Sequence, residues 1–359
     1  MTNWMTRFSL FAFLSIMFFA CDNDVRDEES RMVVLRVLSP KKDAQFVEGQ
    51  NVEVQLDIRE ASSSAVLELK LNGEVVLTKK GVEKEEMLIL TADHIRLGFN
   101  EIEILLEGLD DKKHTDKRKI IVFANTQYDI LIPNIHKTYP HNPKHYTQGY
   151  EFFGNRLFEG TGQFGQSMVA EINLNTGDAI RKVANESRIF GEGITILNDE
   201  IFQLTWQHRI CYVYDLNDFS LKKEFTYDGE GWGLANDGEN LYMSNGTSTI
   251  YVRNPKTFEI LRTFEVFSNQ REYRFLNELE YVDGFLYANV YQQDYILKID
   301  PKDGRVLALI DCDELAKDGR GKGEVLNGIA YNKNNKRFYI TGKYWDKVFE
   351  VSLQAKAEI

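Results

Sequence analysis

Short runs in which apolar and polar residues alternate fill most of this chain, and tight turns separate them. One unit recurs five times from residue 148 onward: an opening phrase, a turn rich in Asn, Asp and Gly, an apolar–aromatic pair, and an alternating run. Alternation is typical of half-buried strands, and these turn residues tolerate the positive φ of tight hairpins. The opening phrases are Gln148-Gly149-Tyr150-Glu151, Gly191-Glu192-Gly193-Ile194, Gly231-Trp232-Gly233-Leu234, Asn277-Glu278-Leu279-Glu280 and Asn327-Gly328-Ile329-Ala330.

The spacing of these phrases predicts the fold of residues 125–359. Successive copies lie roughly 40–50 residues apart, which is the period of a propeller blade. We therefore expect an all-β, five-bladed β-propeller with the phrases gathered at the rim of one pocket. The fifth copy ends near Leu353 without a fourth apolar run. The segment Tyr128–Tyr139 is expected to supply that strand and so to remove an open sheet edge.

A different pattern covers residues 32–124. Its short alternating runs lie at the spacing of a β-sandwich: Val33–Leu38, Val52–Ile58, Val66–Leu71, Met87–Leu90, Asn100–Leu106 and Lys119–Phe123. The pattern resembles the immunoglobulin-like modules that stand between anchor and enzyme in many bacterial surface proteins. No cluster of His, Cys or carboxylate residues in this stretch indicates catalysis, so we expect a spacer or binding module.

The first residues read as an export signal. Arg7 precedes the apolar stretch Phe8–Ala20, which is too short to span a bilayer well. Phe18-Phe19-Ala20-Cys21 resembles the lipobox of bacterial lipoproteins, although Phe18 stands where leucine is usual. We expect residues 1–21 to be a lipoprotein signal with Cys21 lipidated, residues 22–31 to be a linker, and the protein to be anchored to the cell envelope by lipid alone. A plain secretory signal is the alternative.

Charge and the remaining candidate ligands narrow the chemistry. The net charge of −12 argues against a nucleic-acid partner, which requires a basic face. Cys211 and Cys312 lie in different repeats without metal-ligand spacing, and we expect two separate buried thiols, with a disulfide as the alternative. His141 and His145 lack a third ligand at sensible spacing, so no metal site is predicted. The chain contains neither a phosphate-binding loop nor a Gly-x-Ser-x-Gly elbow.

Eight phrases in register resemble one known family. They are Tyr146-Thr147-Gln148-Gly149, Phe190-Gly191-Glu192-Gly193, Leu204-Thr205-Trp206, Glu230-Gly231-Trp232-Gly233-Leu234, Leu276-Asn277-Glu278-Leu279-Glu280, Ala288-Asn289-Val290-Tyr291, Leu326-Asn327-Gly328-Ile329-Ala330 and Thr341-Gly342-Lys343-Tyr344-Trp345. This set resembles the plant-type glutaminyl-peptide cyclotransferases, or glutaminyl cyclases, which are five-bladed propellers. The resemblance covers about residues 128–353 and does not extend to the first 125 or so.

The resemblance implies a reaction and its participants. A peptide's N-terminal glutamine would become pyroglutamate as its α-amine attacks its own side-chain amide and ammonia leaves. Glu192 matches the position of the family's proposed acid/base, and a carboxylate in an apolar pocket is suited to move both protons. Lys343 and Asn277 match catalytic positions at which donors could stabilise the oxyanion. Glu230, Glu278 and Glu280 stand next to the matching position, which favours a structural or supporting role.

The resemblance also assigns the walls of the pocket. Gln148 matches a polar position, and four aromatic residues match further substrate-binding positions: Tyr146, Phe190, Trp206 and Trp232. Tyr291 stands where relatives commonly have tryptophan, which keeps an aromatic face but shrinks it. Ordinary packing between blades is the competing interpretation of these rings.

The expected partners are peptides or proteins with an N-terminal glutamine. The resemblance implies no required cofactor, a structural calcium ion is left open, and we expect a monomer. Because propellers host many functions, two alternatives stand beside the enzyme. One is a non-catalytic propeller that binds peptides or glycans at the cell surface. The other is a metal-dependent lactonase, which chelators would inactivate.

Overall fold

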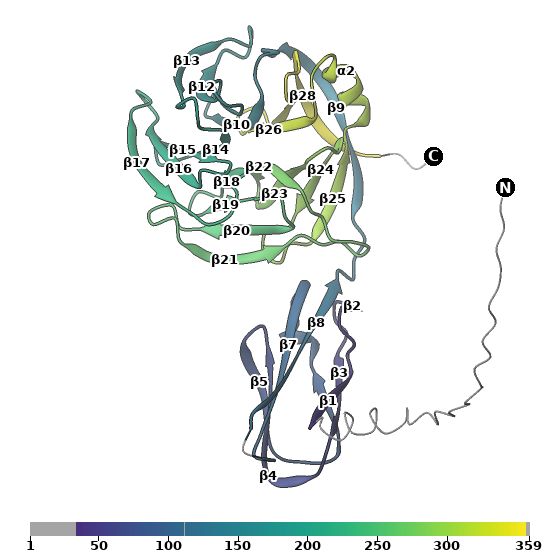
Figure 1. The fold of residues 1–359 in the computed structure, drawn as a ribbon. Coiled ribbons are helices and arrows are strands. Elements are labelled where there is room, and N and C mark those ends of the chain that lie inside the picture. Colours follow the sequence, from purple (N-terminus) through teal and green to yellow (C-terminus); the bar gives the residue numbers. More distant parts are fainter. Residues whose placement is uncertain (1–33, 111, 357–359) are drawn as a thin grey trace, which may run out of the picture.

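The computed structural model describes residues 34–110 and 112–356, which form two β-rich parts (Figure 1). The predicted signal, Cys21 and the linker lie outside these residues. No helix in the described ranges is long and apolar enough to cross a bilayer. The all-β class predicted from the alternating runs is confirmed, because strands make up almost all of the regular structure.

Two sheets form the N-terminal part. One has the order β1-β3-β6 and the other β2-β8-β7-β4-β5. Buried and exposed residues alternate along β3, and its inward side chains join those of the other sheet in one apolar core. The elements are β1 (Leu35–Ser39), β2 (Ala44–Val47), β3 (Val52–Ile58), β4 (Ser62–Leu71), β5 (Glu74–Val82), β6 (Glu85–Leu90), the 3-10 helix η1 (Ala92–His94), β7 (Gly98–Glu107) and β8 (His114–Phe123).

The sequence missed β2 and β5 in this part. Strand β2 has only four residues, and β5 lies at the edge of its sheet and contains a glycine, so neither shows a long alternating pattern.

Three four-stranded antiparallel sheets begin the C-terminal part. In each sheet consecutive strands are neighbours. The first contains β10 (Thr147–Phe153), β11 (Arg156–Thr161), β12 (Met168–Ile172) and β13 (Ala179–Ala184); the second β14 (Gly191–Leu197), β15 (Glu200–Thr205), β16 (Ile210–Asp215) and β17 (Leu221–Thr226); the third β18 (Leu234–Asn236), β19 (Leu241–Met243), β20 (Thr249–Arg253) and β21 (Ile260–Glu265).

The remaining strands form one eight-stranded sheet made of two antiparallel units. The first unit contains β22 (Leu276–Val282), β23 (Phe285–Val290), β24 (Tyr295–Ile299) and β25 (Val306–Asp311); the second β26 (Leu326–Asn332), β27 (Arg337–Gly342), β28 (Lys347–Ala355) and β9 (Asp129–Pro140). Strand β9 pairs antiparallel with β28, so the prediction that residues 128–139 complete the last unit is confirmed. The start of β9 also pairs with β25, which joins the two units.

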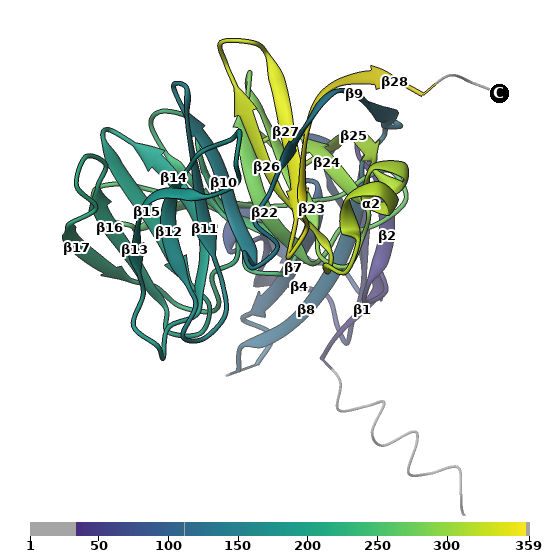
Figure 2. The ribbon, with the colours of Figure 1, turned by 90° about the horizontal axis from the view of Figure 1, so that it is seen from above.

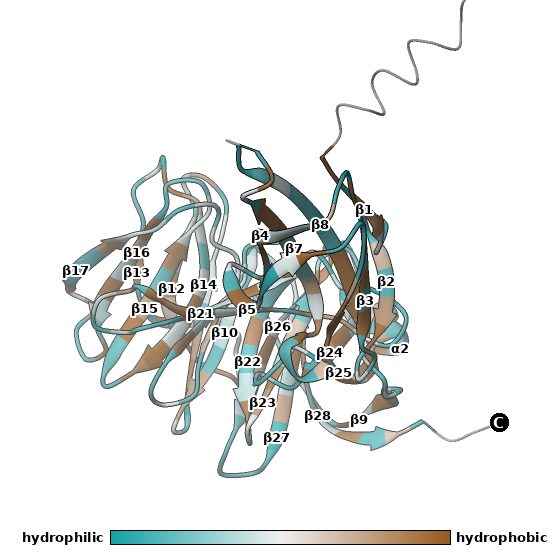
Figure 3. Cartoon of the chain, turned by 90° about the horizontal axis from the view of Figure 1, so that it is seen from below, coloured by the Kyte–Doolittle hydropathy of each residue, from teal (hydrophilic) through white to brown (hydrophobic). Residues whose placement is uncertain are grey.

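The inner strands surround a common axis. Strand β10 contacts β14 and β26, β14 contacts β18, and β22 contacts β18 and β26, so the five inner strands close a ring. Figure 1 shows these strands at the centre, with β17 and β21 at the periphery, and Figure 2 also shows β17 at the outer edge. Figure 3 shows that hydrophobic segments lie mainly on the strands, whereas the connecting loops are mostly hydrophilic.

One helix, α2 (Asp313–Arg320), was not anticipated. Asp313 and Glu314 lie in its first turn, and Lys317 and Arg320 in its last, the charge order that suits the helix dipole. The preceding Cys312 is buried and free, as is Cys211 in β16, which confirms two separate thiols.

The two parts meet at a small apolar contact. Leu97, Ala124 and Phe267 form a buried cluster, and Phe99 packs edge-on against Phe267 with ring centroids 5.4 Å apart. The backbone N–H of Phe99 donates a hydrogen bond of 2.6 Å to Glu265 Oε2. The N-terminal part therefore touches the C-terminal part beside its outer strand β21.

Candidate functional site

One cavity brings together all the residues to which the sequence assigned a role in binding or catalysis. It has a volume of about 250 Å³. Its walls come from the starts of inner strands and from the loops that follow the second strand of four of the five units. The lining residues are Tyr146, Gln148, Gln163, Phe190, Glu192, Trp206, Trp232, Asn277, Tyr291 and Lys343.

Glu192 is the only carboxylate that lines this cavity among the described residues. It lies between two glycines at the start of β14, and a Cβ atom at Gly193 would stand 2.7 Å from the Cα of Gly233. Only glycine lets the two inner strands approach this closely. Glu192 is 4% exposed. Desolvation raises its pKa well above the usual range, the Lys343 ammonium opposes this, and the Glu230 carboxylate adds to it.

Lys343 supplies the cation of the cavity. It follows β27 and is 1% exposed. Its Nζ donates a hydrogen bond to Gln148 Oε1 and lies 4.3 Å from the centre of the Tyr146 ring. Burial lowers the pKa of Lys343 to about 8, against the opposing effect of the Glu192 charge. A buried carboxyl group and a buried amine in one cleft, both with shifted pKa values, are the pattern expected of a site that moves protons.

Glu230 holds the two indoles in place. Its Oε2 accepts hydrogen bonds from Trp206 Nε1 at 2.8 Å and from Trp232 Nε1 at 3.1 Å. Partial burial would raise its pKa, but hydrogen bonds from Gln207 and the two indoles outweigh this and lower it. Glu230 is therefore an ionised carboxylate that orients the walls and does not line the cavity itself.

The aromatic walls are linked edge to face. Phe190 lies 5.6 Å from Trp206 and 6.0 Å from Tyr146 between ring centroids. On the other side Tyr291 lies 5.8 Å from Trp232 at an angle of 83°. Such pairs lock ring orientation. The smaller Tyr291 ring thus occupies the wall position that its sequence match indicated.

Asn277 carries an unsatisfied polar atom. It stands at the start of β22, is 3% exposed, and its buried Oδ1 has no hydrogen-bond partner in the described part of the chain. Buried acceptors are normally paired, so an unpaired one in a cleft marks a place for a ligand N–H. Asn289 lies outside the lining; its Oδ1 accepts a hydrogen bond from the Gly328 N–H at 3.0 Å, and its buried Nδ2 has no partner among the described residues.

Comparisons with known proteins agree on one family. The family model described as "Glutamine cyclotransferase" matches residues 108–353, more than half of the chain. The chain belongs to this family. The Arabidopsis thaliana glutaminyl-peptide cyclotransferase is 41% identical over 227 residues, covering 61% of this chain and 71% of the relative. The crystal structure of Myxococcus xanthus glutaminyl cyclase aligns with a TM-score of 0.61 and 28% identity, over 64% of this chain and 100% of that chain.

These matches place the site in the part shared with the family. All ten lining residues fall within residues 108–353. The Myxococcus structure is covered completely by 64% of this chain, so the remaining third of this glutamine cyclotransferase has no counterpart there.

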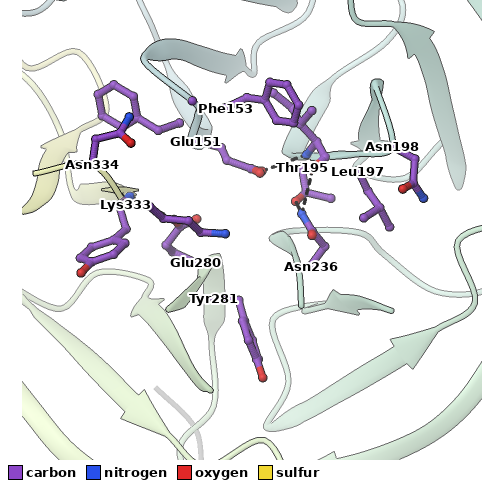
Figure 4. A pocket seen from close by; sticks show the side chains of 14 residues that line it. Glu151, Phe153, Thr195, Leu197, Asn198, Asn236, Glu280, Tyr281, Lys333 and Asn334 are labelled. Atoms are coloured by element: carbon purple, nitrogen blue, oxygen red, sulfur yellow. Dashed lines mark hydrogen bonds between the residues drawn. The ribbon is translucent and has the colours of Figure 1, made fainter. Parts of the chain in front are cut away.

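A second cavity of about 380 Å³ lies at the opposite ends of the inner strands (Figure 4). Glu151 and Glu280 reach into it, and Lys333 lies nearby. Desolvation raises the pKa of Glu151 to about 7 and that of Glu280 well above its usual range. Both carboxylates also accept backbone N–H groups, Glu151 from Ile196 at 3.1 Å and Glu280 from Tyr331 at 3.0 Å. Its lining also includes four aromatic residues, Phe152, Phe153, Tyr281 and Tyr331, but no tryptophan.

Glu278 joins inner strands in the same way. Its two carboxylate oxygens accept the N–H groups of Tyr150 and Ile329 at 3.2 and 2.8 Å. Its contacts are therefore structural, as its place beside the matching family position suggested.

The structure corrects the interpretation of His141 and His145. The sequence offered them no third ligand, but β11 brings Glu159 between them, and one ligand atom of each residue lies within 4.8 Å of the others. Glu159 accepts hydrogen bonds from His141 Nε2 at 3.1 Å, His145 Nδ1 at 2.7 Å and Thr147 Oγ1 at 2.8 Å. His141 Nδ1 donates to the carbonyl of Trp345 at 2.9 Å. These hydrogen bonds describe a buried ion pair, and the expectation of no metal stays a prediction.

Gln163 is the lining residue that the sequence did not single out. It lies in the loop after β11 and has a φ of 86°, unusual for a residue other than glycine. The flanking glycines of Gly162-Gln163-Phe164-Gly165 were the available signal, because they indicate a tight loop at the position where other units carry pocket residues.

Proposed function

We propose that this chain is a glutaminyl-peptide cyclotransferase, which converts the N-terminal glutamine of peptides or proteins to pyroglutamate and releases ammonia. Family membership supports the reaction, and the site supports its chemistry. The observation that carries the proposal is the pairing, in one aromatic-walled cavity, of the desolvated carboxylate of Glu192 with the ammonium of Lys343.

The substrate brings both reacting groups in one residue. The neutral α-amine attacks the side-chain amide carbon, which forms the ring bond, and the C–N bond to the leaving nitrogen then breaks. Because amine and amide are tethered, holding the productive rotamer supplies much of the acceleration. The rings of Phe190, Trp206, Trp232, Tyr146 and Tyr291 enclose the glutamine stem and exclude water.

Glu192 moves the protons in this mechanism. It accepts one from the attacking amine and returns it to the departing nitrogen, so ammonia leaves and the carboxylate is restored. Lys343, whose Nζ contacts Gln148 Oε1, would donate to the oxygen that becomes negative. Asn277 Oδ1 is free to accept an N–H from the substrate.

Ammonia release from a Gln-initiated peptide tests the proposal. We expect Glu192→Gln to lower kcat by roughly 10²- to 10⁴-fold, the range for losing a general acid–base group. Glu314→Gln is the matched control, because it makes the same change on a side chain that is 89% exposed on α2. Full activity of Glu192→Gln would refute the shuttle. Peptide binding without ammonia release by the wild type would favour a non-catalytic binding propeller.

We propose further that no cofactor is required and that any bound calcium is structural. Cyclisation should then survive chelators, whereas a metal-dependent lactonase would lose activity with them. Complete inactivation by a chelator, in protein that stays folded, would contradict this. We also expect a monomer, which the elution volume in size-exclusion chromatography would check.

The architecture is proposed to be a five-bladed propeller over residues 125–359 behind an immunoglobulin-like sandwich over residues 32–124. Five inner strands in a ring and the closing strand β9 support the first, and two sheets around one core support the second.

The localisation is proposed from the sequence alone. Residues 1–21 would direct export, Cys21 would carry lipid, residues 22–31 would form a linker, and the enzyme would stand on the cell envelope. Detergent-phase partitioning of the protein should be lost in Cys21→Ser. Unchanged partitioning would argue against the lipid anchor.

A further inference from the structure

Gln163 lines the site cavity but takes no part in the chemistry proposed above. It lies in the loop between β11 and β12, outside the eight phrases that carry the family resemblance. Gln163 is partly exposed, whereas Glu192, Asn277 and Lys343 are buried. It therefore stands on the solvent side of the groups assigned to the reaction.

The backbone of Gln163 is tied to the strand that carries Glu192. Its carbonyl accepts hydrogen bonds from the Ser167 N–H at 2.9 Å and from Ser167 Oγ at 2.7 Å, and that Oγ accepts one from the Gly191 N–H at 2.9 Å. Gln163 has a φ of 86°, a value that residues other than glycine adopt at a cost in energy. The loop is thus held in one shape against local strain, and the side chain starts from a fixed point.

Gly162 brings this loop against the cavity wall. Its N–H donates a hydrogen bond of 2.8 Å to the Tyr146 carbonyl. A Cβ atom at Gly162 would stand 2.5 Å from the Phe190 ring and 3.1 Å from Gln148 Cγ, so a larger residue would push the loop away from these side chains. Gln163 is therefore held beside this wall of the cavity.

The side-chain oxygen of Gln163 is the acceptor left on the solvent side of the lining. Gln148 Oε1 already accepts from Lys343 Nζ, and Asn277 Oδ1 is buried. Within residues 34–110 and 112–356, no hydrogen bond occupies the side-chain amide of Gln163. An amide oxygen can accept an N–H, so this one is available to a ligand that enters the cavity.

The substrate chain leaves the cavity on this solvent side. The side chain and α-amine of the terminal glutamine react beside Glu192 and Lys343, so the rest of the peptide runs outward. The Cα of the second residue is only about 3.8 Å from that of the glutamine, and the N–H of the second residue lies between them. Entering the cavity removes water from this N–H, which then needs an acceptor at the same level.

Resting on the proposed function, we propose that Gln163 Oε1 accepts a hydrogen bond from the N–H of the residue that follows the N-terminal glutamine. Gln163 is then a specificity-determining residue for the first peptide bond of the substrate. It favours glutamine in an amide-linked chain over glutamine that lacks this N–H, as in free glutamine or a glutaminyl ester. Losing one such hydrogen bond is expected to lower kcat/KM roughly three- to tenfold.

Two substrates that differ only in this N–H test the inference. One is the dipeptide amide of glutamine and alanine, and the other is its depsipeptide, in which lactic acid replaces alanine and an ester oxygen replaces the N–H. The ratio of kcat/KM for the amide to that for the ester should be roughly three to ten times larger in the wild type than in Gln163→Gly. Glycine removes the side chain and adopts a φ of 86° without strain. The intrinsic reactivity of each substrate is the same with both proteins, so it cancels from this comparison.

Two further variants isolate the acceptor. Gln163→Glu keeps an acceptor oxygen and loses the N–H donor, so it should retain the wild-type ratio; a ratio as low as that of Gln163→Gly would reject the acceptor role. The matched control is Gln166→Gly, because Gln166 is an exposed glutamine of the same loop and lies outside the lining. This control should leave the ratio unchanged.

The outcomes separate the role of Gln163 from the proposed function. A folded wild type that cyclises neither substrate refutes the function itself. Cyclisation with the same ratio in wild type and Gln163→Gly, or an equal loss in Gln166→Gly, overturns the role of Gln163 and leaves the function standing. Should Gln163→Gly fail to fold, Gln163→Asn, which also accepts a positive φ but is one methylene shorter, must lower the ratio, or the role is rejected.

Discussion

Replacing Glu159 with glutamine should destabilise the C-terminal part strongly although Glu159 lies outside the site. The side chains of Glu159 and His141 are 0% exposed, and that of His145 is 8% exposed. Removing one partner from a buried ion pair costs about 3–5 kcal/mol. Glutamine keeps one acceptor oxygen for the three donors, so we expect about 3 kcal/mol, or a fall in Tm of about 6–12 °C for a part of this size.

The pH dependence gives this prediction a sign. Burial alone would lower the pKa of His141, but the charge and hydrogen bond of Glu159 raise it above 6.5. Its contribution to stability is therefore complete below about pH 6.5 and is lost as pH rises through the folded-state pKa. Burial would raise the pKa of Glu159, but the two histidines lower it below 4.5, so its contribution is present above that pH and is lost only in stronger acid. The two effects overlap at about pH 5–6.

Differential scanning calorimetry of wild type and Glu159→Gln across pH 5–9 measures the effect. The difference in Tm should be largest near pH 5–6 and should shrink toward alkaline pH as His141 loses its proton. A control such as Glu171→Gln, on the next strand and partly exposed, should show a smaller and flatter difference. A Tm for Glu159→Gln within 2 °C of wild type at pH 5–6, or a difference that grows with pH, would refute the reasoning.

Three further predictions concern the cavity. Because burial lowers the pKa of Lys343 to about 8, kcat/KM of the wild type should fall above that pH. In Lys343→Arg the pH at which kcat/KM falls should rise by at least about one unit. A wild-type profile that stays flat from pH 7 to 9 would contradict this. Glu230→Gln removes the charged acceptor of both indole N–H groups. We therefore expect kcat/KM to fall roughly 5- to 30-fold and tryptophan fluorescence to shift. An unchanged spectrum with full activity would count against this role of Glu230. Gly193→Ala should lower the free energy of unfolding by about 1–3 kcal/mol in chemical denaturation, because the alanine Cβ would lie 2.7 Å from the Gly233 backbone. A variant as stable as wild type would show that the inner strands can move apart.

The sequence predicted the structural features that depend on the repeat period and on local turn residues. Strands in the five repeats follow from alternation and turn residues, and the need for β9 followed from counting apolar runs. Strand β2 and helix α2 were not predicted, because four residues or two helical turns show too little periodicity in the sequence. The contact of Glu159 with the two histidines was not predicted for another reason. Its partners are 18 and 14 residues away, and only the pairing of β11 with β10 brings it between them.

The cavity was predictable only as a set of residues. The resemblance named the residues that line it, yet no spacing shows that Glu230 would bind both indoles or that Asn277 Oδ1 would be left unpaired. These properties arise from side-chain directions at the ends of different strands. They decide which carboxylate is ionised and which is desolvated, and so which one can move a proton.

The position of the proposed catalytic pair, Glu192 and Lys343, depends on how the ring is closed. Glu192 comes from the second unit of the C-terminal part, whereas Lys343 follows β27 in the last unit and reaches Gln148 of the first. The last unit is completed by β9, which directly follows the segment joining it to the N-terminal part. In that segment the Ala124 N–H donates to the Ser268 carbonyl at 3.1 Å, and Ala124 is packed with Leu97 and Phe267. The same short segment therefore contacts the N-terminal part and leads into the strand that closes the ring.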